Sequence, residues 1–167
     1  MIFVTVGTHE QQFNRLVRKV DELKESGALE DEVVVQTGYS TFHPDHCRWK
    51  QWFDYDEMCE CMEKARIIVT HGGPASFLPP IRLGKMPVVV PRQKQYAEHV
   101  NDHQVEFTEA AREMGAGIIL TENIDELGDV LADYDRYAVE AAGHDLAGSN
   151  NLRFNQQLEE LTESLFS

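Results

Sequence analysis

The sequence predicts a single α/β domain with a doubly wound, mostly parallel sheet. Short runs of continuously apolar residues alternate along the chain with segments in which apolar residues recur every three or four positions. Runs without polar alternation are typical of strands buried on both faces, as parallel strands are when helices cover them. The chain has 167 residues, of which 42% are hydrophobic, and this is enough for one core. We therefore expect about six strands in one Rossmann-like sheet.

The expected elements follow one another in regular alternation. Six apolar runs are the expected strands: 2–7, 32–38, 48–53, 66–73, 86–92 and 116–120. Apolar residues at helical spacing predict helices within 13–23, 55–65, 75–83, 100–114, 124–131 and 152–166. Pro79 and Pro80 are expected to interrupt the third of these helices, because proline lacks an N–H and crowds the preceding turn.

A domain boundary is expected in the stretch 141–151, which is rich in glycine, alanine and asparagine. Residues 1–140 would form the folded domain, and residues 141–167 a flexible segment followed by a helix. That helix would place Leu158, Leu161 and Leu165 on one face. These leucines would either pack on the domain's own sheet or dock on a partner, and the sequence leaves both alternatives open.

Composition excludes several classes of protein. The net charge of −14 argues against binding to nucleic acid, because such proteins usually present a basic face to the phosphate backbone. Three cysteines form no even-numbered disulfide framework, and reduced thiols are the simplest interpretation. Met1 leads directly into an apolar run, and no apolar run approaches the ~20 residues that cross a bilayer. We therefore expect a cytoplasmic protein.

The most informative motif follows the fourth expected strand. His71, Gly72 and Gly73 end that strand, Pro74 fits the first turn of a helix, and Ser76 places a hydroxyl beside that turn. Glycines permit close approach of the backbone, so free N–H groups and the helix dipole could face a phosphate or diphosphate. The alternative is an ordinary strand–helix turn whose glycines only relieve crowding.

Two further loops point to the same edge of the sheet. Residues 7–10 (Gly-Thr-His-Glu) follow the first strand and residues 91–94 (Pro-Arg-Gln-Lys) follow the fifth. In open α/β sheets, ligands bind beyond the carboxyl ends of the strands, where such loops converge. Neither the GxGxxG nor the GxxxxGK[ST] pattern occurs, so a dinucleotide fingerprint and a P-loop are both absent from the sequence.

The stretch THGGPASFLPPIRLGKMPVVVPRQKQYAEHVNDHQVEFTEAAREMG resembles the C-terminal, nucleotide-sugar-binding domain of GT-B glycosyltransferases of family 28. More closely, this stretch and the opening MIFVTVGTHEQQFNRLVRKVD resemble the PssE/EpsF-like bacterial exopolysaccharide proteins. They also resemble the cytosolic catalytic subunit of the split eukaryotic UDP-GlcNAc transferase. The resemblance runs from Met1 to about Leu131, and its HGGxxS, GKxPVVVPR and NDHQ motifs occur in the family's order and spacing.

The resemblance implies a UDP-sugar site and no required metal or other cofactor. The residues it implies for nucleotide-sugar binding are Gly7, Thr8, His71, Gly72, Gly73, Ser76, His103 and Gln104. Arg92 is the expected cationic contact to the leaving UDP, because GT-B enzymes stabilise that charge with protein groups. One position departs from the wider superfamily: Pro79 stands where a ribose-binding glutamate is usual.

The resemblance also implies half of an enzyme, because a GT-B active site lies between two such domains. The missing half would be a membrane-associated, PssD-like Rossmann partner that binds a polyprenyl-diphosphate-linked acceptor and recruits the chain to the inner face of the plasma membrane. The expected activity is that of a UDP-sugar-dependent hexosyltransferase in exopolysaccharide synthesis. His9 is the best general base within the chain, although the partner could supply one. The alternatives are a non-catalytic accessory subunit and a binding module for another phosphorylated ligand.

Three other patterns are weaker. The DYD sequences at 54–56 and 133–135 are expected at helix edges, where aspartate favours capping over metal binding. The HPDHC stretch at 43–47 does not converge with Cys59 and Cys61 in a way that would suit zinc. Trp49 and Trp52 are expected in the core or at an interface.

Overall fold

The structure, a computed structural model, describes residues 1–143, Glu160 and Glu163. Most of the segment expected over 141–167, including its docking helix, therefore lies outside the described residues. Within the described part of the chain, no helix is both long and apolar enough to cross a membrane.

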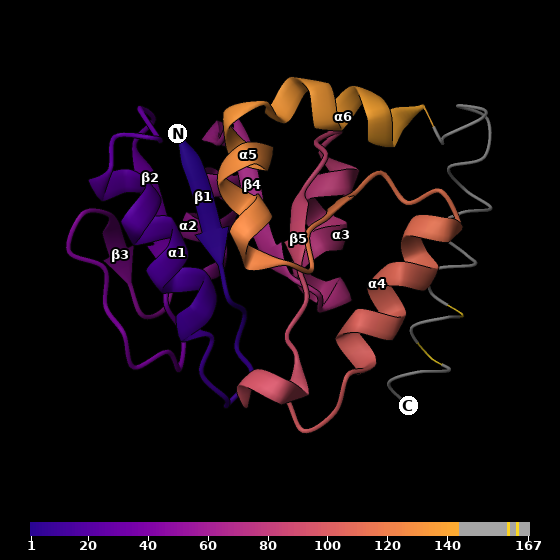
Figure 1. The fold of residues 1–167 in the computed structure, drawn as a ribbon, viewed down its shortest axis with the longest axis horizontal. Helices are drawn as coiled ribbons and strands as arrows, with labels where there is room; N and C mark the ends of the chain where they lie inside the picture. Colours follow the sequence, from indigo (N-terminus) through magenta and orange to yellow (C-terminus); the bar gives the residue numbers. More distant parts are fainter. Residues whose placement is uncertain (144–159, 161–162, 164–167) are drawn as a thin grey trace.

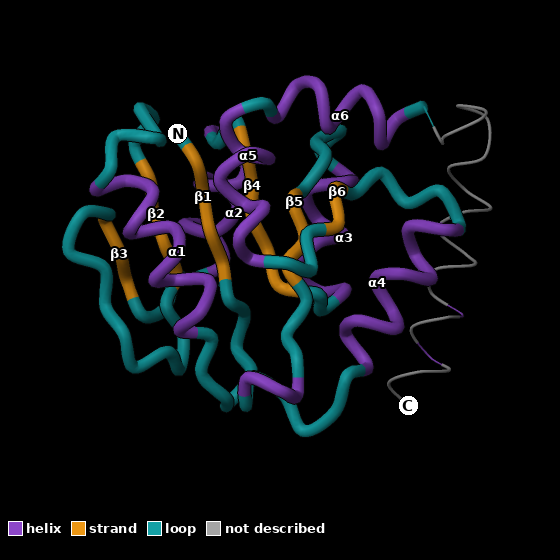
Figure 2. The backbone as a smooth tube through the Cα atoms, in the orientation of Figure 1, coloured by secondary structure: helices purple, strands orange, loops and turns teal. Residues whose placement is uncertain are grey.

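The sheet has six parallel strands in the order β3-β2-β1-β4-β5-β6. Figure 2 shows the strands side by side, with the sheet running across the molecule. This confirms the predicted doubly wound α/β class. The strand bounds are β1 (Ile2–Thr5), β2 (Val33–Gln36), β3 (Arg48–Lys50), β4 (Ile67–His71), β5 (Val88–Val90) and β6 (Ile119–Leu120).

Helices cover both faces of this sheet. In Figure 1, α1 and α5 lie in front of the strands, α6 runs along the top, and α2 and α3 lie behind the strands. The helix bounds are α1 (Asn14–Glu25), α2 (Tyr55–Lys64), α3 (Pro74–Arg82), α4 (His103–Glu113), α5 (Leu127–Ala132) and α6 (Tyr134–Ala142). Two 3₁₀ turns, η1 (Lys94–Tyr96) and η2 (Ile124–Glu126), complete the described elements.

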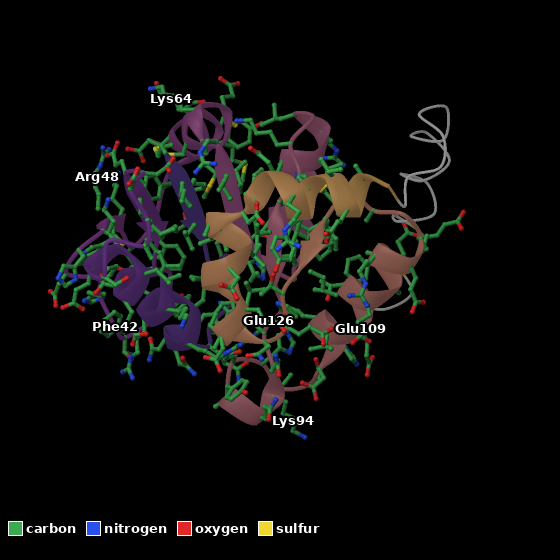
Figure 3. The ribbon with its side chains drawn as sticks, turned by 45° about the horizontal axis from the view of Figure 1, so that its top comes forward. Phe42, Arg48, Lys64, Lys94, Glu109 and Glu126 are labelled. Carbon is green, nitrogen blue, oxygen red and sulfur yellow. The ribbon has the colours of Figure 1, made fainter. Side chains whose placement is uncertain are left out.

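In β1, β2, β4 and β5, successive residues alternate between the apolar clusters on the two faces of the sheet, whereas the residues of β3 are exposed. In β1, Val4 packs with Leu16 of α1 on one face of the sheet. Phe3 packs with Met62 of α2 on the other face. Ile2, Phe3 and Val4 of β1 are all fully buried. This strand therefore has a continuous apolar run instead of an alternation of apolar and polar residues. The labelled Arg48, Lys64 and Lys94 lie at the periphery of the molecule (Figure 3).

Helix α3 corrects one expectation, because it runs unbroken through Pro79 and Pro80. Each proline removes one N–H donor from the helix. Their own carbonyls still accept hydrogen bonds, at 3.2 and 3.1 Å, from the N–H of Leu83, and Pro80 is buried beside Phe77. The prolines also stand close to the end of a nine-residue helix, so few bonds are lost. Helix α6, which no periodic pattern predicted, follows Asp133.

The weaker sequence patterns have mostly structural roles. Asp54 is the N-cap of α2, where its carboxylate accepts a hydrogen bond from the N–H of Glu57, and Asp133 stands at the start of α6. Among the described residues, no group of three or more His, Cys, Asp or Glu side chains is placed to hold a metal ion. Trp49 and Trp52 are each 38% exposed. They therefore do not lie in the core, which was one of the two locations expected for them.

Candidate functional site

A cavity of about 890 Å³ opens at the carboxyl edge of the sheet and extends between α2 and α3. It lies against β1 and β4, the two strands from which the chain winds outward in opposite directions. Ligands of open α/β sheets bind at this point of reversal, because the loops that follow the two strands diverge there. The predicted edge of the sheet is therefore the edge that is hollowed.

The imidazole of His71 fills the base of this cavity. The ring is enclosed by two glycines that come from different strand-end loops. A Cβ atom added to Gly7 would lie 2.2 Å from Nε2 of the ring, and one added to Gly73 would lie 2.3 Å from Cε1. Gly7 also has a positive φ of 75°, a conformation that favours glycine. Both glycines are therefore needed for the close packing of His71.

Each nitrogen of the His71 ring has a partner. Nε2 lies 2.8 Å from Oγ of Ser76, and Nδ1 accepts a hydrogen bond of 3.0 Å from the N–H of Gly73. Nδ1 also lies 3.2 Å from Nε2 of Gln104. Burial, and then the positive charge of Arg92, lower the pKa of His71 to about 3. The ring is consequently neutral at physiological pH.

The expectation of open N–H groups at both motif glycines needs correction. The N–H of Gly72 is bonded to Oε1 of Gln104 at 3.0 Å, and that of Gly73 is bonded to His71. Crowding explains these glycines too, because a Cβ on Gly72 would lie 3.0 Å from the Gln104 Cβ. In the first turn of α3, Ser76 N–H bonds to Gly73 O, and only the exposed Ala75 keeps an N–H without an acceptor among the described residues.

Two stacked histidines line the cavity. The rings of His9 and His99 are parallel within 6°, with centroids 4.5 Å apart, and both residues line the cavity. Nε2 of His9 lies 2.9 Å from Oε1 of Gln11. Burial, and then the nearby His9, lower the pKa of His99. Sequence reasoning missed His99, although it follows β5 just as His9 follows β1, and that shared placement was the available signal.

Arg92 lies behind the cavity and not on its wall. It is fully buried, and its guanidinium donates to the carbonyl oxygens of Val6, Gln11, Gln12 and Glu98 at 2.7–3.2 Å. Burial lowers the pKa of Arg92 to about 10, so the group stays charged at neutral pH. Its observed contacts join the loops after β1 and β5. A direct contact between Arg92 and a leaving group stays a prediction that these contacts do not favour.

The structure brings most of the expected site residues together. Those that line the cavity are Gly7, Thr8, His9, His71, Gly73, Ser76 and Gln104. Those that do not are Gly72, Arg92 and His103. Pro79 also lines the cavity, on the α3 side.

This parallel sheet order, with a cavity at the β1/β4 reversal, defines a Rossmann-like domain of the kind that forms the C-terminal half of GT-B glycosyltransferases. Residues 1–133 match the glycosyltransferase family 28 C-terminal domain. That match covers most of the chain, which therefore belongs to this family.

Solved structures have the same fold. The chain is similar to the crystal structure of the glycosyltransferase SnogD from Streptomyces nogalater, with a TM-score of 0.51 and 20% identity over 96% of this chain and 39% of that one. It is also similar to the glycosyltransferase of kitacinnamycin, with a TM-score of 0.52 and 17% identity over 98% of this chain and 41% of the other. The chain thus spans about two fifths of either protein. No curated protein matched it.

We predict that His71 makes the protein sensitive to acid. The unfolded chain binds a proton at the ordinary histidine pKa of 6.5, whereas the folded chain binds it only near 3. Below pH 6.5 the proton therefore favours the unfolded state, and the free energy of unfolding falls by about 1.4 kcal/mol per pH unit from this residue alone. In the His71→Asn variant, the free energy of unfolding, measured by urea titration at several pH values, should fall less steeply with decreasing pH than in the wild type. Parallel declines in the two proteins would contradict the burial of a neutral ring.

We predict that Arg92 is required for stability. Arg92→Lys removes the planar set of donors and should lower the free energy of unfolding by about 2–4 kcal/mol, because buried carbonyl groups lose their partners. The matched control is Arg82→Lys, which changes an exposed arginine on the cavity wall and should alter stability by less than about 0.5 kcal/mol. Equal stability of the two variants, measured by chemical denaturation, would show that the Arg92 contacts are dispensable.

Proposed function

We propose that this chain is the donor-binding catalytic subunit of a two-chain GT-B glycosyltransferase. It would move a hexose from a UDP-sugar to a polyprenyl-diphosphate-linked acceptor in exopolysaccharide synthesis. The observation that carries this proposal is the cavity at the β1/β4 reversal, beside the first turn of α3, in a chain of family 28. A nucleoside diphosphate has both an anionic and an apolar part, and the cavity has a region suited to each.

The first turn of α3 suits the diphosphate. The N-terminal end of a helix favours negative charge, because its free N–H groups and dipole point toward the ligand. Here that end offers the N–H of Ala75 and the hydroxyl of Ser76, and both residues line the cavity. Thr8 lines it from the loop after β1. These groups would replace the open glycine N–H groups that the sequence had suggested.

The channel between α2 and α3 suits the nucleoside. Its walls are largely apolar, with Met58 and Met62 from α2 facing Pro79 and Leu83 from α3. Pro79 offers no carboxylate to the ribose hydroxyls. Glu63 of α2 is the carboxylate among the residues that line the cavity, and we assign it this contact.

His9 remains the candidate general base. It lines the cavity, where its partly exposed ring could meet an acceptor, and the ring is held by the stack with His99. If Nε2 donates to Gln11, the lone pair of Nδ1 is available for a proton. The acceptor oxygen would bond to C1 of the sugar as the bond from C1 to the diphosphate breaks, and the hydroxyl proton would pass to Nδ1. No metal is required for these steps.

The acceptor-binding half would come from a membrane-associated, PssD-like partner that also brings this cytoplasmic chain to the membrane. One observation supports a partner. Tyr96 and Val100, which lie near His99 in the chain, are 47% and 68% exposed, and exposed apolar side chains beside a site offer a surface for contact with another protein.

A non-catalytic accessory subunit is the second candidate. It is favoured by the internal hydrogen bonds of the Gly72 and Gly73 N–H groups and by the burial of Arg92, which leave fewer groups for a nucleotide. Binding of UDP separates the two candidates, because only the first requires it.

Calorimetric titration of the purified chain with UDP tests the proposal. Ala75→Glu places a negative charge at the first turn of α3 and should weaken UDP binding at least about tenfold relative to Ala75→Gln, which has nearly the same size but no charge. Ala75 is exposed, so both variants should keep the fold. A wild-type chain that binds no UDP, or equal UDP affinities in the two variants, would contradict the proposal.

A further inference from the structure

The side-chain amide of Gln104 connects the ends of two strands. Gln104 lies in the first turn of α4 and is 4% exposed. Its Oε1 accepts hydrogen bonds of 3.0 Å from the N–H of Gly72, which follows β4, and 3.0 Å from the N–H of Arg92, which follows β5. Backbone N–H groups can only donate, so the atom that they share must be the amide oxygen.

This orientation determines the direction of the next bond. Because Oε1 faces the two backbone groups, the NH₂ group faces His71 and donates to Nδ1 at 3.2 Å. The N–H of Gly73 donates to the same nitrogen at 3.0 Å. Two donors on Nδ1 require a lone pair there. A neutral imidazole has one N–H, which must then be on Nε2.

The chain of hydrogen bonds ends at the cavity wall. Nε2–H of His71 donates to Oγ of Ser76 at 2.8 Å, so the hydroxyl hydrogen of Ser76 must point elsewhere. Within the described part of the chain, that hydrogen has no acceptor, and Ser76 lines the cavity. A hydroxyl held in this way offers a donor to whatever enters.

We propose that Gln104 is a positioning residue that acts through His71 to turn the hydroxyl hydrogen of Ser76 into the cavity. Ser76 then donates to an oxygen of the ligand, and this proposal rests on the proposed function in taking that ligand to be a nucleoside diphosphate. The role differs from the direct nucleotide-sugar binding that the resemblance implied for Gln104. It also explains why a buried glutamine stands where two strand ends meet.

Gln104→Glu tests the proposal with little change of shape. At pH 8 the carboxylate still accepts from Gly72 and Arg92 but has no hydrogen to donate to His71. The proton should therefore move to Nδ1 of His71, where the carboxylate accepts it although the N–H of Gly73 then loses its acceptor. Ser76 should then donate to Nε2 instead of to the ligand. Nitrogen-15 NMR of the ligand-free proteins reports the tautomer, and His71→Asn assigns the His71 signals among the seven histidines. We expect the Nε2–H form in the wild type and the Nδ1–H form in the variant.

A double-mutant cycle in UDP affinity provides a readout that a merely structural role would not give. Gln104→Glu should weaken UDP binding at least about tenfold in the wild type, but much less in the Ser76→Ala background, where the hydroxyl is already missing. Repulsion between the new carboxylate and the ligand acts in both backgrounds and cancels.

Two results would overturn the proposal: an Nδ1–H tautomer in the wild type, or equal losses of UDP affinity in the two backgrounds. The tautomer measurement needs no ligand, so it separates this proposal from the proposed function. An Nε2–H tautomer in a chain that binds no UDP would support the hydrogen-bond chain while contradicting the donor-binding role.

Discussion

The enclosure of a neutral imidazole at the end of β4 is the constraint on which the site depends. His71 stands where two strand-end loops and two helices meet, and its ring leaves no room for a side chain at Gly7 or Gly73. Desolvation keeps it uncharged, and its two nitrogens divide into an acceptor, facing Gln104 and Gly73, and a donor, facing Ser76. The ring therefore links the hydrogen bonds at the strand ends to the orientation of the Ser76 hydroxyl on the cavity wall.

Arg92 complements this arrangement from behind. Its guanidinium binds four carbonyl oxygens and lies over the ring of Phe13, 5.0 Å from the ring centroid, so the loops after β1 and β5 are held together by one fixed charge. The same charge helps to keep His71 neutral. A preorganised site of this kind pays little for reorganisation when a ligand enters. The loops that bear His9 and His99 are positioned by the same contacts.

The sequence was sufficient for the fold and for the edge of the sheet that is hollowed, because continuous apolar runs and strand-end glycines are local signals. It was not sufficient to predict which groups the buried polar side chains would bond to. Whether Arg92 faces a ligand or four carbonyl oxygens depends on loops far apart in the chain. The same is true of Gln104, whose three partners lie at or just after the ends of β4 and β5. Local rules also misjudged Pro79, because a buried face can hold a short helix together without every backbone hydrogen bond.

The central claim is that the first turn of α3, with the Ser76 hydroxyl oriented by His71, receives a diphosphate. A crystal structure of the chain with UDP bound tests this most directly. The account predicts a diphosphate oxygen within about 3 Å of the Ser76 Oγ, a hydrogen-bond distance, with the nucleoside between α2 and α3. Nucleotide bound at another surface, with the cavity unfilled and Ser76 directed toward protein atoms, would contradict it.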